Sequence, residues 1–203
     1  MEDINRLQGQ LNIVKDSLPD NLQVSDVSLR YYCGHPEWPA FIMLHTWIFQ
    51  LHLDLYRFAL PGIREQAHSE LFRALPQGFL INAQYQAIAF AIVLSRFWES
   101  SLSLMRSLSP SQEQLLTADH VLPPCIIQST KILLLARQYS MFFDLRACST
   151  VPAFRDEPAD DTHLERLVKS NMALLDSLVD VMPKVKIMVS KIKSSHSWLL
   201  RHR

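Results

Sequence analysis

Apolar residues recur along this chain with the period of an α-helix, and the pattern is strongest between residues 39 and 60. After its first residue this stretch contains no proline or glycine, and Pro61-Gly62 ends it. Five apolar residues at spacings of three and four share one face, namely Leu44, Ile48, Leu51, Leu55 and Phe58. Other apolar residues occupy the remaining sides, which is typical of a helix enclosed by other helices. We therefore predict a central buried helix over about 39–60.

The rest of the chain repeats this pattern in further segments, and no stretch alternates with the period of a strand. The first segment carries Ile4, Leu7, Leu11, Val14 and Leu18, so one side of it should be covered. The remaining predicted helices are 63–75, 83–107, 110–118, 125–145, 162–182 and 185–199. We interpret residues 19–37 as an ordered connector and the Pro-rich and acidic residues 149–161 as an exposed loop. The prediction is all-α, with seven or eight helices in one bundle-like array formed by a single domain over residues 1–203.

The composition favours a helical protein in a reducing compartment. Hydrophobic residues make up 48% of the 203 residues and there are only four glycines. Twenty basic residues balance 20 acidic ones, which is a poor electrostatic footprint for nucleic-acid binding. Cys33, Cys125 and Cys148 are odd in number and far apart, so we expect no disulfide framework. The polar N-terminus predicts no signal peptide, and Asp54 and Arg57 argue against a membrane span in the central helix.

Three segments of the chain resemble one protein family. The segment LHLDLYRFALPG, residues 51–62, is similar to a stretch of the fungal-specific transcription factor regulatory domain, the middle homology region of fungal binuclear zinc-cluster regulators. The segments 7–22, LQGQLNIVKDSLPDNL, and 123–139, PPCIIQSTKILLLARQY, resemble further parts of it. The family often has a tryptophan where this chain has Val14, and nothing here resembles the zinc cluster itself.

The resemblance implies a nuclear regulatory domain, of which this chain would be the C-terminal part. Such a domain regulates transcription by RNA polymerase II through effectors, dimer contacts or co-regulators. It would reach DNA only through a missing N-terminal zinc-cluster domain, so zinc is implied for that domain alone. The residues themselves carry no catalytic motif, no clustered cysteines and no membrane span, so we expect a chain that is not an enzyme, does not contact a membrane and holds no cofactor or metal of its own.

Two constellations could carry chemistry, but each has a structural interpretation. His45 and His52 share a helix face and lie about 10 Å apart along the axis at 1.5 Å per residue, without a third ligand nearby in sequence. We interpret them as packed polar residues in a helical core, and Asp54 and Arg57 as an i,i+3 helix pair.

The acidic segment DDTHLE, residues 160–165, resembles the magnesium-binding motifs of helical terpene synthases. However, Leu164 occupies a position where those motifs have aspartate. Thr162 and Glu165 instead form a capping-box signature, S/T-x-x-E, and helix capping explains these acids without catalysis. We therefore predict no catalytic, cofactor-binding or metal-binding residues.

A second hypothesis from another class stays open at this point. A stand-alone helical protein could bind a small apolar ligand or a partner helix, with aromatic residues lining the site. The candidates are Trp47, Phe49, Phe90, Trp98, Phe142 and Phe143. The C-terminal segment from residue 181 contains basic residues and no Asp or Glu. We interpret it as a solvated helix face rather than a DNA-binding patch. Its basic residues are Lys184, Lys186, Lys191, Lys193, Arg201 and Arg203.

Overall fold

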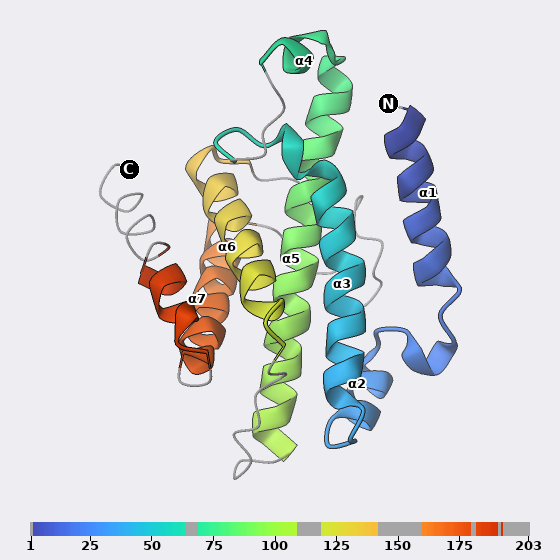
Figure 1. Ribbon diagram of the computed structural model, residues 1–203, viewed down its shortest axis with the longest axis vertical. Helices are drawn as coiled ribbons and strands as arrows, with labels where there is room; N and C mark the ends of the chain where they lie inside the picture. Colours follow the sequence, from blue (N-terminus) through green and yellow to red (C-terminus); the bar gives the residue numbers. More distant parts are fainter. Residues whose placement is uncertain are drawn as a thin grey trace.

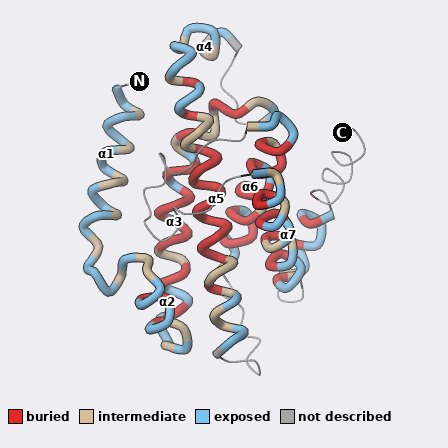
Figure 2. Tube along the Cα trace, turned by 180° about the vertical axis from the view of Figure 1, so that it is seen from behind, coloured by how far each residue is buried: buried red, intermediate tan, exposed pale blue. Residues whose placement is uncertain are grey.

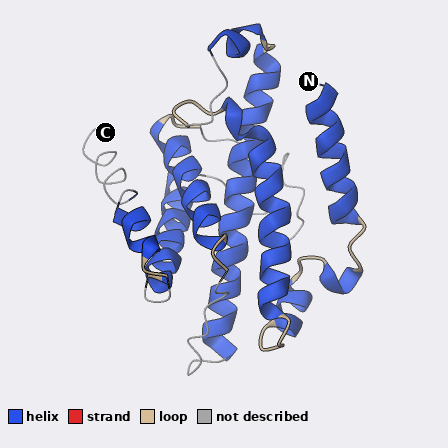
Figure 3. Ribbon diagram, viewed as in Figure 1, coloured by secondary structure: helices blue, strands red, loops and turns tan. Residues whose placement is uncertain are grey.

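The computed structural model describes residues 2–63, 69–108, 119–141, 160–179, 182–190 and 192. Within these residues every regular element is a helix and no strand is present (Figure 3). In chain order the elements are α1 (Glu2–Asp16), the 3-10 helix η1 (Asp20–Leu22), α2 (Asp26–Tyr32), α3 (Trp38–Tyr56), the 3-10 helix η2 (Arg57–Ala59), α4 (Ser69–Ala74), α5 (Gln77–Leu108), α6 (Leu122–Gln138) and α7 (Asp161–Leu178). Residues 184–190 are also helical. The all-α prediction is confirmed.

The long helix α5 is the element against which most of the others pack. Helix α3 lies along one side of it, and α6 and α7 lie along the other side (Figure 1). Helix α1 lies on the outer side of α3 (Figure 1). Buried residues concentrate along α3, α5, α6 and α7, whereas α1 is largely exposed (Figure 2). The predicted helix over about 39–60 is thus present and buried as α3, and it shares the centre of the array with α5.

Helix α3 is not enclosed on all of its apolar sides. Leu51, in the middle of the stripe from Leu44 to Phe58, is 45% exposed, and of that stripe only Ile48 is buried. The buried face carries Phe49, Leu53 and Tyr56 instead, each at most 2% exposed. Because α3 is apolar on several sides, periodicity alone could not select the face. The contact with α5 selects it.

The apolar side of the first segment is covered only in part, since Ile4, Leu11 and Leu18 are half-buried whereas Leu7 and Val14 are exposed. No residue of α1 is buried, and Leu7 and Val14 are 44% and 52% exposed. Ile4 and Leu18, at the two ends of the stripe, do pack partly against the core. Helix α1 packs mainly against α3, and one neighbouring helix covers only part of a helix face.

The connector over residues 19–37 contains η1 and the short helix α2, which the sequence analysis did not predict. Ser25 and Ser28 form a reciprocal capping box: the Ser28 backbone N–H donates to Ser25 Oγ at 3.1 Å, and the Ser25 N–H donates to Ser28 Oγ at 2.9 Å. Leu29 and Tyr32 then bury one side of α2. The usual capping-box pattern has Glu or Gln at the third helical position, where this chain has Ser28, so the pattern did not identify this helix start.

Helix α5 begins at Gln77, immediately after Pro76, and is therefore longer than the predicted 83–107. One side of it is buried, since Ile88, Ala91 and Trp98 are at most 1% exposed. Within the described residues α5 is also the one helix long and apolar enough to cross a membrane, over Gln77–Ser107. Since 56% of its apolar window is buried inside the protein, packing by neighbouring helices accounts for this hydropathy.

Helix α6 begins and ends earlier than predicted. It starts at Leu122, so that Pro123 lies in the first turn, where a missing N–H costs no helical hydrogen bond. It ends at Gln138 rather than Leu145 because Ser140 adopts a left-handed conformation, with φ of 50°. The Met141 N–H then donates to the Ala136 carbonyl at 2.8 Å, and the Ser140 N–H donates to the Arg137 carbonyl at 3.2 Å. These bonds form a Schellman motif, which satisfies carbonyls at the helix end.

Helix α7 begins one residue before the predicted capping box. Asp160, not Thr162, caps it by accepting a hydrogen bond from the His163 N–H at 2.8 Å. Leu164 and Leu175 are fully buried, and α7 ends at Leu178 rather than at Met182. The predicted helix 110–118 and residues 149–159 of the predicted loop lie outside the described residues.

Candidate functional site

A polar cleft with a volume of about 660 Å³ opens between α2, α5 and α7. This volume falls in the range of small-ligand sites in proteins, roughly 300 to 1,000 Å³. We call it the arginine cleft, because arginines from three helices line it. Its lining residues are Asp26, Leu29, Arg30, Arg96, Glu99, Ser100, Ser103, Leu104, Ser107 and Arg166.

The C-terminal half of α5 supplies most of this lining. Its contribution recurs at helical spacing, so these side chains form one polar stripe; they are Arg96, Glu99, Ser100, Ser103 and Ser107. Helix α2 adds Asp26 and Arg30, and α7 adds Arg166. Helix α5 is therefore apolar where other helices surround it and polar where the cleft begins.

The charged groups of the cleft differ in their burial and in their hydrogen bonds and ion pairs. Arg96 is only 8% exposed, so it is largely held within the protein. Arg166 donates to the carboxylate of Glu99. In the part of the chain that the structure describes, the guanidinium of Arg30 has no hydrogen bond or ion pair, and the same holds for the hydroxyls of Ser100 and Ser103. Three arginines against two carboxylates, Asp26 and Glu99, leave a formal charge of +1.

The two histidines of α3 are buried, at 2% and 1% exposure, as the sequence analysis predicted. The Nε2 atom of His45 lies 2.7 Å from the Leu22 carbonyl oxygen, to which it donates in the neutral tautomer that carries its hydrogen there. The ring of His52 stacks on Phe90 with centroids 4.5 Å apart, and neither of its nitrogens has a hydrogen-bond partner among the described residues. The two histidines therefore make different contacts: His45 forms a hydrogen bond with a backbone carbonyl, and His52 stacks on an aromatic ring.

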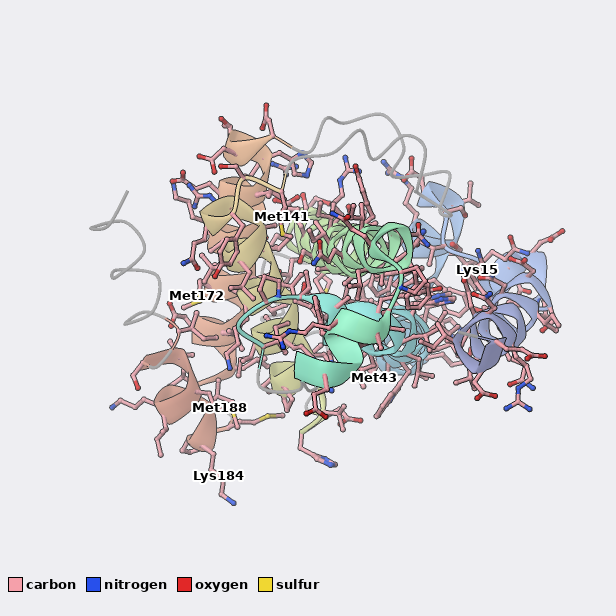
Figure 4. The ribbon with its side chains drawn as sticks, turned by 90° about the horizontal axis from the view of Figure 1, so that it is seen from above. Lys15, Met43, Met141, Met172, Lys184 and Met188 are labelled. Atoms are coloured by element: carbon pink, nitrogen blue, oxygen red, sulfur yellow. The ribbon has the colours of Figure 1, made fainter. Side chains whose placement is uncertain are left out.

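Burial lowers the pKa of both histidines to about 4, because the protonated ring would lose its hydration. For His45 the hydrogen bond with Leu22 opposes this effect. For His52 the positive charge of Lys15 lowers the pKa further, and Asp16 opposes it. The Lys15 side chain is 19% exposed, and Figure 4 labels it on α1. Both rings are therefore neutral at physiological pH.

Asp54 and Arg57 form the predicted i,i+3 pair, with Arg57 Nε 3.0 Å from Asp54 Oδ1. The same carboxylate oxygen accepts hydrogen bonds from Gln50 Nε2 at 2.8 Å and from Gln128 Nε2 at 3.3 Å. Since Gln128 belongs to α6, this cluster joins the end of α3 to a helix far along the chain. Its arrangement is that of an interhelical polar contact.

The acids of residues 160–165 engage neighbouring groups of the fold. Asp160 caps α7, and the buried guanidinium of Arg137 on α6 binds Asp161 Oδ1 at 2.8 Å and Glu165 Oε2 at 2.9 Å. Lys169 bonds Glu165 at 2.7 Å and, followed by Arg137, lowers the pKa of that carboxyl. These contacts explain each of the acids.

The thiols of the described cysteines are expected to have low reactivity. Burial raises the pKa of the Cys125 thiol to about 12 and also raises that of the half-buried Cys33. Cys148 lies outside the described residues. Among the residues that are described, no group of three or more His, Cys, Asp or Glu side chains could hold a metal ion.

The aromatic residues considered for an apolar ligand site pack in the core where they are described. Phe49, Phe90 and Trp98 are at most 4% exposed, and Trp98 Nε1 donates to Thr46 Oγ1 at 3.1 Å. Trp47 is 44% exposed. Phe142 and Phe143 lie outside the described residues. Of this set, Phe49, Phe90 and Trp98 are therefore core residues, and Trp47 is a surface residue.

The basic C-terminal segment is described only up to residue 192. Lys184 and Lys186 are exposed while Val185 and Val189 are buried, so the predicted amphipathic pattern is confirmed over these residues. Figure 4 shows Lys184 pointing away from the other helices. Lys191, Lys193, Arg201 and Arg203 lie outside the described residues.

A buried polar network joins α5, α6 and α7. Asn171 Nδ2 donates to Ser95 Oγ at 2.9 Å and to Thr130 Oγ1 at 3.2 Å. Ser95 Oγ lies 2.8 Å from Ser129 Oγ, and both serines reach the Ala91 carbonyl oxygen. By contrast, the buried hydroxyl of Tyr56 has no partner among the described residues. The two environments should respond oppositely to removal of a hydroxyl.

We expect Tyr56→Phe to raise the free energy of unfolding by about 1 kcal/mol, since it removes a desolvated hydroxyl without a partner. Ser95→Ala should lower it by about 1 to 2 kcal/mol, because the Asn171 amide loses an acceptor. Urea denaturation of the wild type and of both variants measures this. Equal destabilisation by the two substitutions would contradict the prediction.

Sequence reasoning missed the arginine cleft. One signal was present, namely the polar stripe in the second half of α5, opposite its apolar face. The partners of that stripe, Arg30 and Arg166, lie far away in the sequence, so only the fold brings them together. By contrast, the histidines and acids that the sequence analysis considered, His45, His52 and those of residues 160–165, lie in the core, cap a helix or bind a neighbouring helix.

A scan against protein-family models and searches of curated proteins and of solved structures find no match to this chain. The resemblance carried by residues 7–22, 51–62 and 123–139 therefore stays a prediction. What function it supports depends on how these segments sit in the fold.

Proposed function

We propose that this chain is a regulatory helical domain of the kind found in fungal zinc-cluster transcription factors, and that it does not itself read DNA. In this role it acts in the nucleus on transcription by RNA polymerase II. It does so through an effector, through co-regulators or through a second copy of itself. DNA contact and zinc binding then belong to a separate N-terminal domain.

The observation that supports this proposal is that the segment 51–62 lies against each of the other two segments that carry the resemblance. Gln128 in residues 123–139 bonds Asp54 in residues 51–62. A Cβ placed on Gly62 would lie 3.7 Å from a Leu135 methyl carbon, so the turn at Pro61-Gly62 packs against α6. Gly62 adopts φ of 79° in this turn. The first segment, 7–22, lies beside the segment 51–62, because α1 packs on α3 and the charges of Lys15 and Asp16 act on His52. Segments that resemble one family are thus also one structural unit.

The neutral charge balance of the chain supports the part of the proposal that concerns DNA. Binding to duplex DNA depends on neutralising several phosphates, whereas this chain carries 20 basic and 20 acidic residues. We expect the purified chain to form no sequence-selective complex with duplex DNA at physiological salt.

The test is a reporter assay in yeast with residues 1–203 fused to an unrelated DNA-binding domain. We expect the fusion to change reporter output several-fold relative to the DNA-binding domain alone. Leu53→Asp places a charge at a fully buried position of α3 and should abolish the effect. Leu51→Asp, on the exposed side of the same helix, is the matched control and should retain it. Output equal to that of the DNA-binding domain alone, or a sequence-selective DNA complex of the purified chain, would contradict the proposal.

The alternative, a stand-alone helical protein that binds a partner helix, has one supporting observation. Trp47 and Leu51 on α3 and Val14 on α1 are between 44% and 52% exposed, and exposed apolar side chains are frequent at interaction surfaces. In that case the wild-type fusion would leave the reporter unchanged, while a bound partner would protect Trp47 from solvent.

A further inference from the structure

We propose that the arginine cleft binds a small phosphate ester whose organic part carries hydroxyl groups. The proposal depends on residues of α2, α5 and α7, none of which carries the family resemblance. It can therefore hold whether or not the chain regulates transcription. If both proposals hold, the ester is the effector.

The arginines make the cleft suited to an oxyanion. A guanidinium presents its N–H groups as a planar fork that matches two oxygens of a phosphate or carboxylate. Arg30 reaches the cleft with no ion pair or hydrogen bond in the described part of the chain. Arg96 is nearly buried, which restricts its side chain, whereas Arg166 bonds Glu99 and is 47% exposed. A bound oxyanion would thus meet the guanidinium of Arg30 beside a restricted Arg96 and a more mobile Arg166.

The size and charge of the cleft favour a small ligand over a nucleic acid. Its volume of about 660 Å³ accommodates a metabolite. Its formal charge of +1 is too small for a tract of phosphates, but it attracts one phosphate group, which carries about −1.5 to −2 at neutral pH. A single phosphate therefore complements the cleft.

The remaining polar groups favour a hydroxylated ester. The Ser100 and Ser103 hydroxyls have no partner among the described residues, and each can donate and accept. The Asp26 carboxylate accepts only, so it would take a hydrogen bond from a ligand hydroxyl and would repel a second phosphate. Leu29 and Leu104 add a small apolar wall. Together these groups match a sugar or polyol phosphate.

The experiment is isothermal titration calorimetry of the full chain with glucose 6-phosphate, glucose and inorganic phosphate at constant ionic strength. We expect glucose 6-phosphate to bind most tightly, inorganic phosphate to bind more weakly and glucose not to bind. Arg30→Gln should weaken glucose 6-phosphate binding by about tenfold, because a charge-assisted contact is lost. Arg73→Gln removes an exposed arginine on α4, outside the cleft, and should leave binding unchanged.

Each other result would overturn the proposal or part of it. Failure of both phosphate probes to bind excludes the oxyanion site, and an equal loss in Arg30→Gln and Arg73→Gln shows only general charge attraction. Equal affinity for inorganic phosphate and for glucose 6-phosphate would show that the cleft does not recognise the hydroxyl groups of the ester. Ser103→Ala provides a second test: this exposed side chain has no hydrogen-bond partner in the described chain, so folding should persist while ester binding weakens. Unchanged ester binding in both Arg30→Gln and Ser103→Ala would place the ligand elsewhere.

Discussion

Between pH 6.5 and pH 4 the free energy of unfolding should fall by several kcal/mol, because His45 and His52 remain neutral in the folded chain. In the unfolded chain both rings have the ordinary pKa of 6.5, whereas burial lowers it to about 4 in the fold. In this window the unfolded chain therefore binds protons that the folded chain does not. Acid thus favours unfolding.

The expected size of the effect is roughly 3 kcal/mol for each histidine once the pH lies below both pKa values. The stability they contribute is fully present above pH 6.5 and levels off below pH 4. Glu165 has a lowered pKa, so its contribution is lost as pH falls through that lowered value, below 4.5. The window above pH 4.5 therefore reports mainly the histidines.

Urea denaturation at closely spaced pH values measures this dependence. His52→Phe keeps a ring against Phe90 and removes one titrating group, so between pH 4.5 and 6 it should reduce the slope by up to about 1.4 kcal/mol per pH unit. Tyr56→Phe, one turn further along α3, is the matched control and should leave the slope unchanged. A wild-type slope of zero in this window would mean that the rings are hydrated.

The longer helices could be predicted from the sequence because their signals are local, whereas the short helix α2 was missed. Proline positions, caps and 3.6-residue periodicity lie within a few residues of each boundary, and α3, α5 and α7 were located on that basis. Their faces were less predictable where a helix is apolar all round. On α3 the Leu51 side is exposed and the Phe49 side is buried, because the position of α5 decides between them.

The arginine cleft could not be predicted because its chemistry is distributed over the fold. Arg30, Arg96 and Arg166 come from three helices, and none has a sequence motif around it. The sequence instead drew attention to His45, His52 and the acids of residues 160–165, whose residue types suggest chemistry. In the structure these groups pack in the core, cap a helix or bind Arg137. A residue type indicates a site only when the fold leaves its polar groups available.

The interaction of Arg137 with Asp161 and Glu165 should make a large contribution to stability. The Arg137 side chain is 6% exposed and makes three hydrogen bonds to these two carboxylates across the α6–α7 contact. Removing one partner of a buried ion pair costs roughly 3 to 5 kcal/mol. Here the carboxylates are 38% and 35% exposed, and water can hydrate them after the loss. We therefore expect Arg137→Ala to lower the free energy of unfolding by about 2 to 3 kcal/mol.

The matched control is Arg166→Ala, which also breaks an ion pair of α7 with a neighbouring helix. Its side chain is 47% exposed, so the expected loss is below about 1 kcal/mol. Urea denaturation measures the loss of stability in each variant. In a second experiment, magnesium added to the wild type should leave the melting temperature unchanged, because Arg137 already binds Asp161 and Glu165. Equal losses in both variants would contradict the role assigned to the Arg137 contact. Stabilisation by magnesium that disappears in Asp161→Ala would instead assign these acids to a metal site, and with it the enzymatic interpretation of residues 160–165.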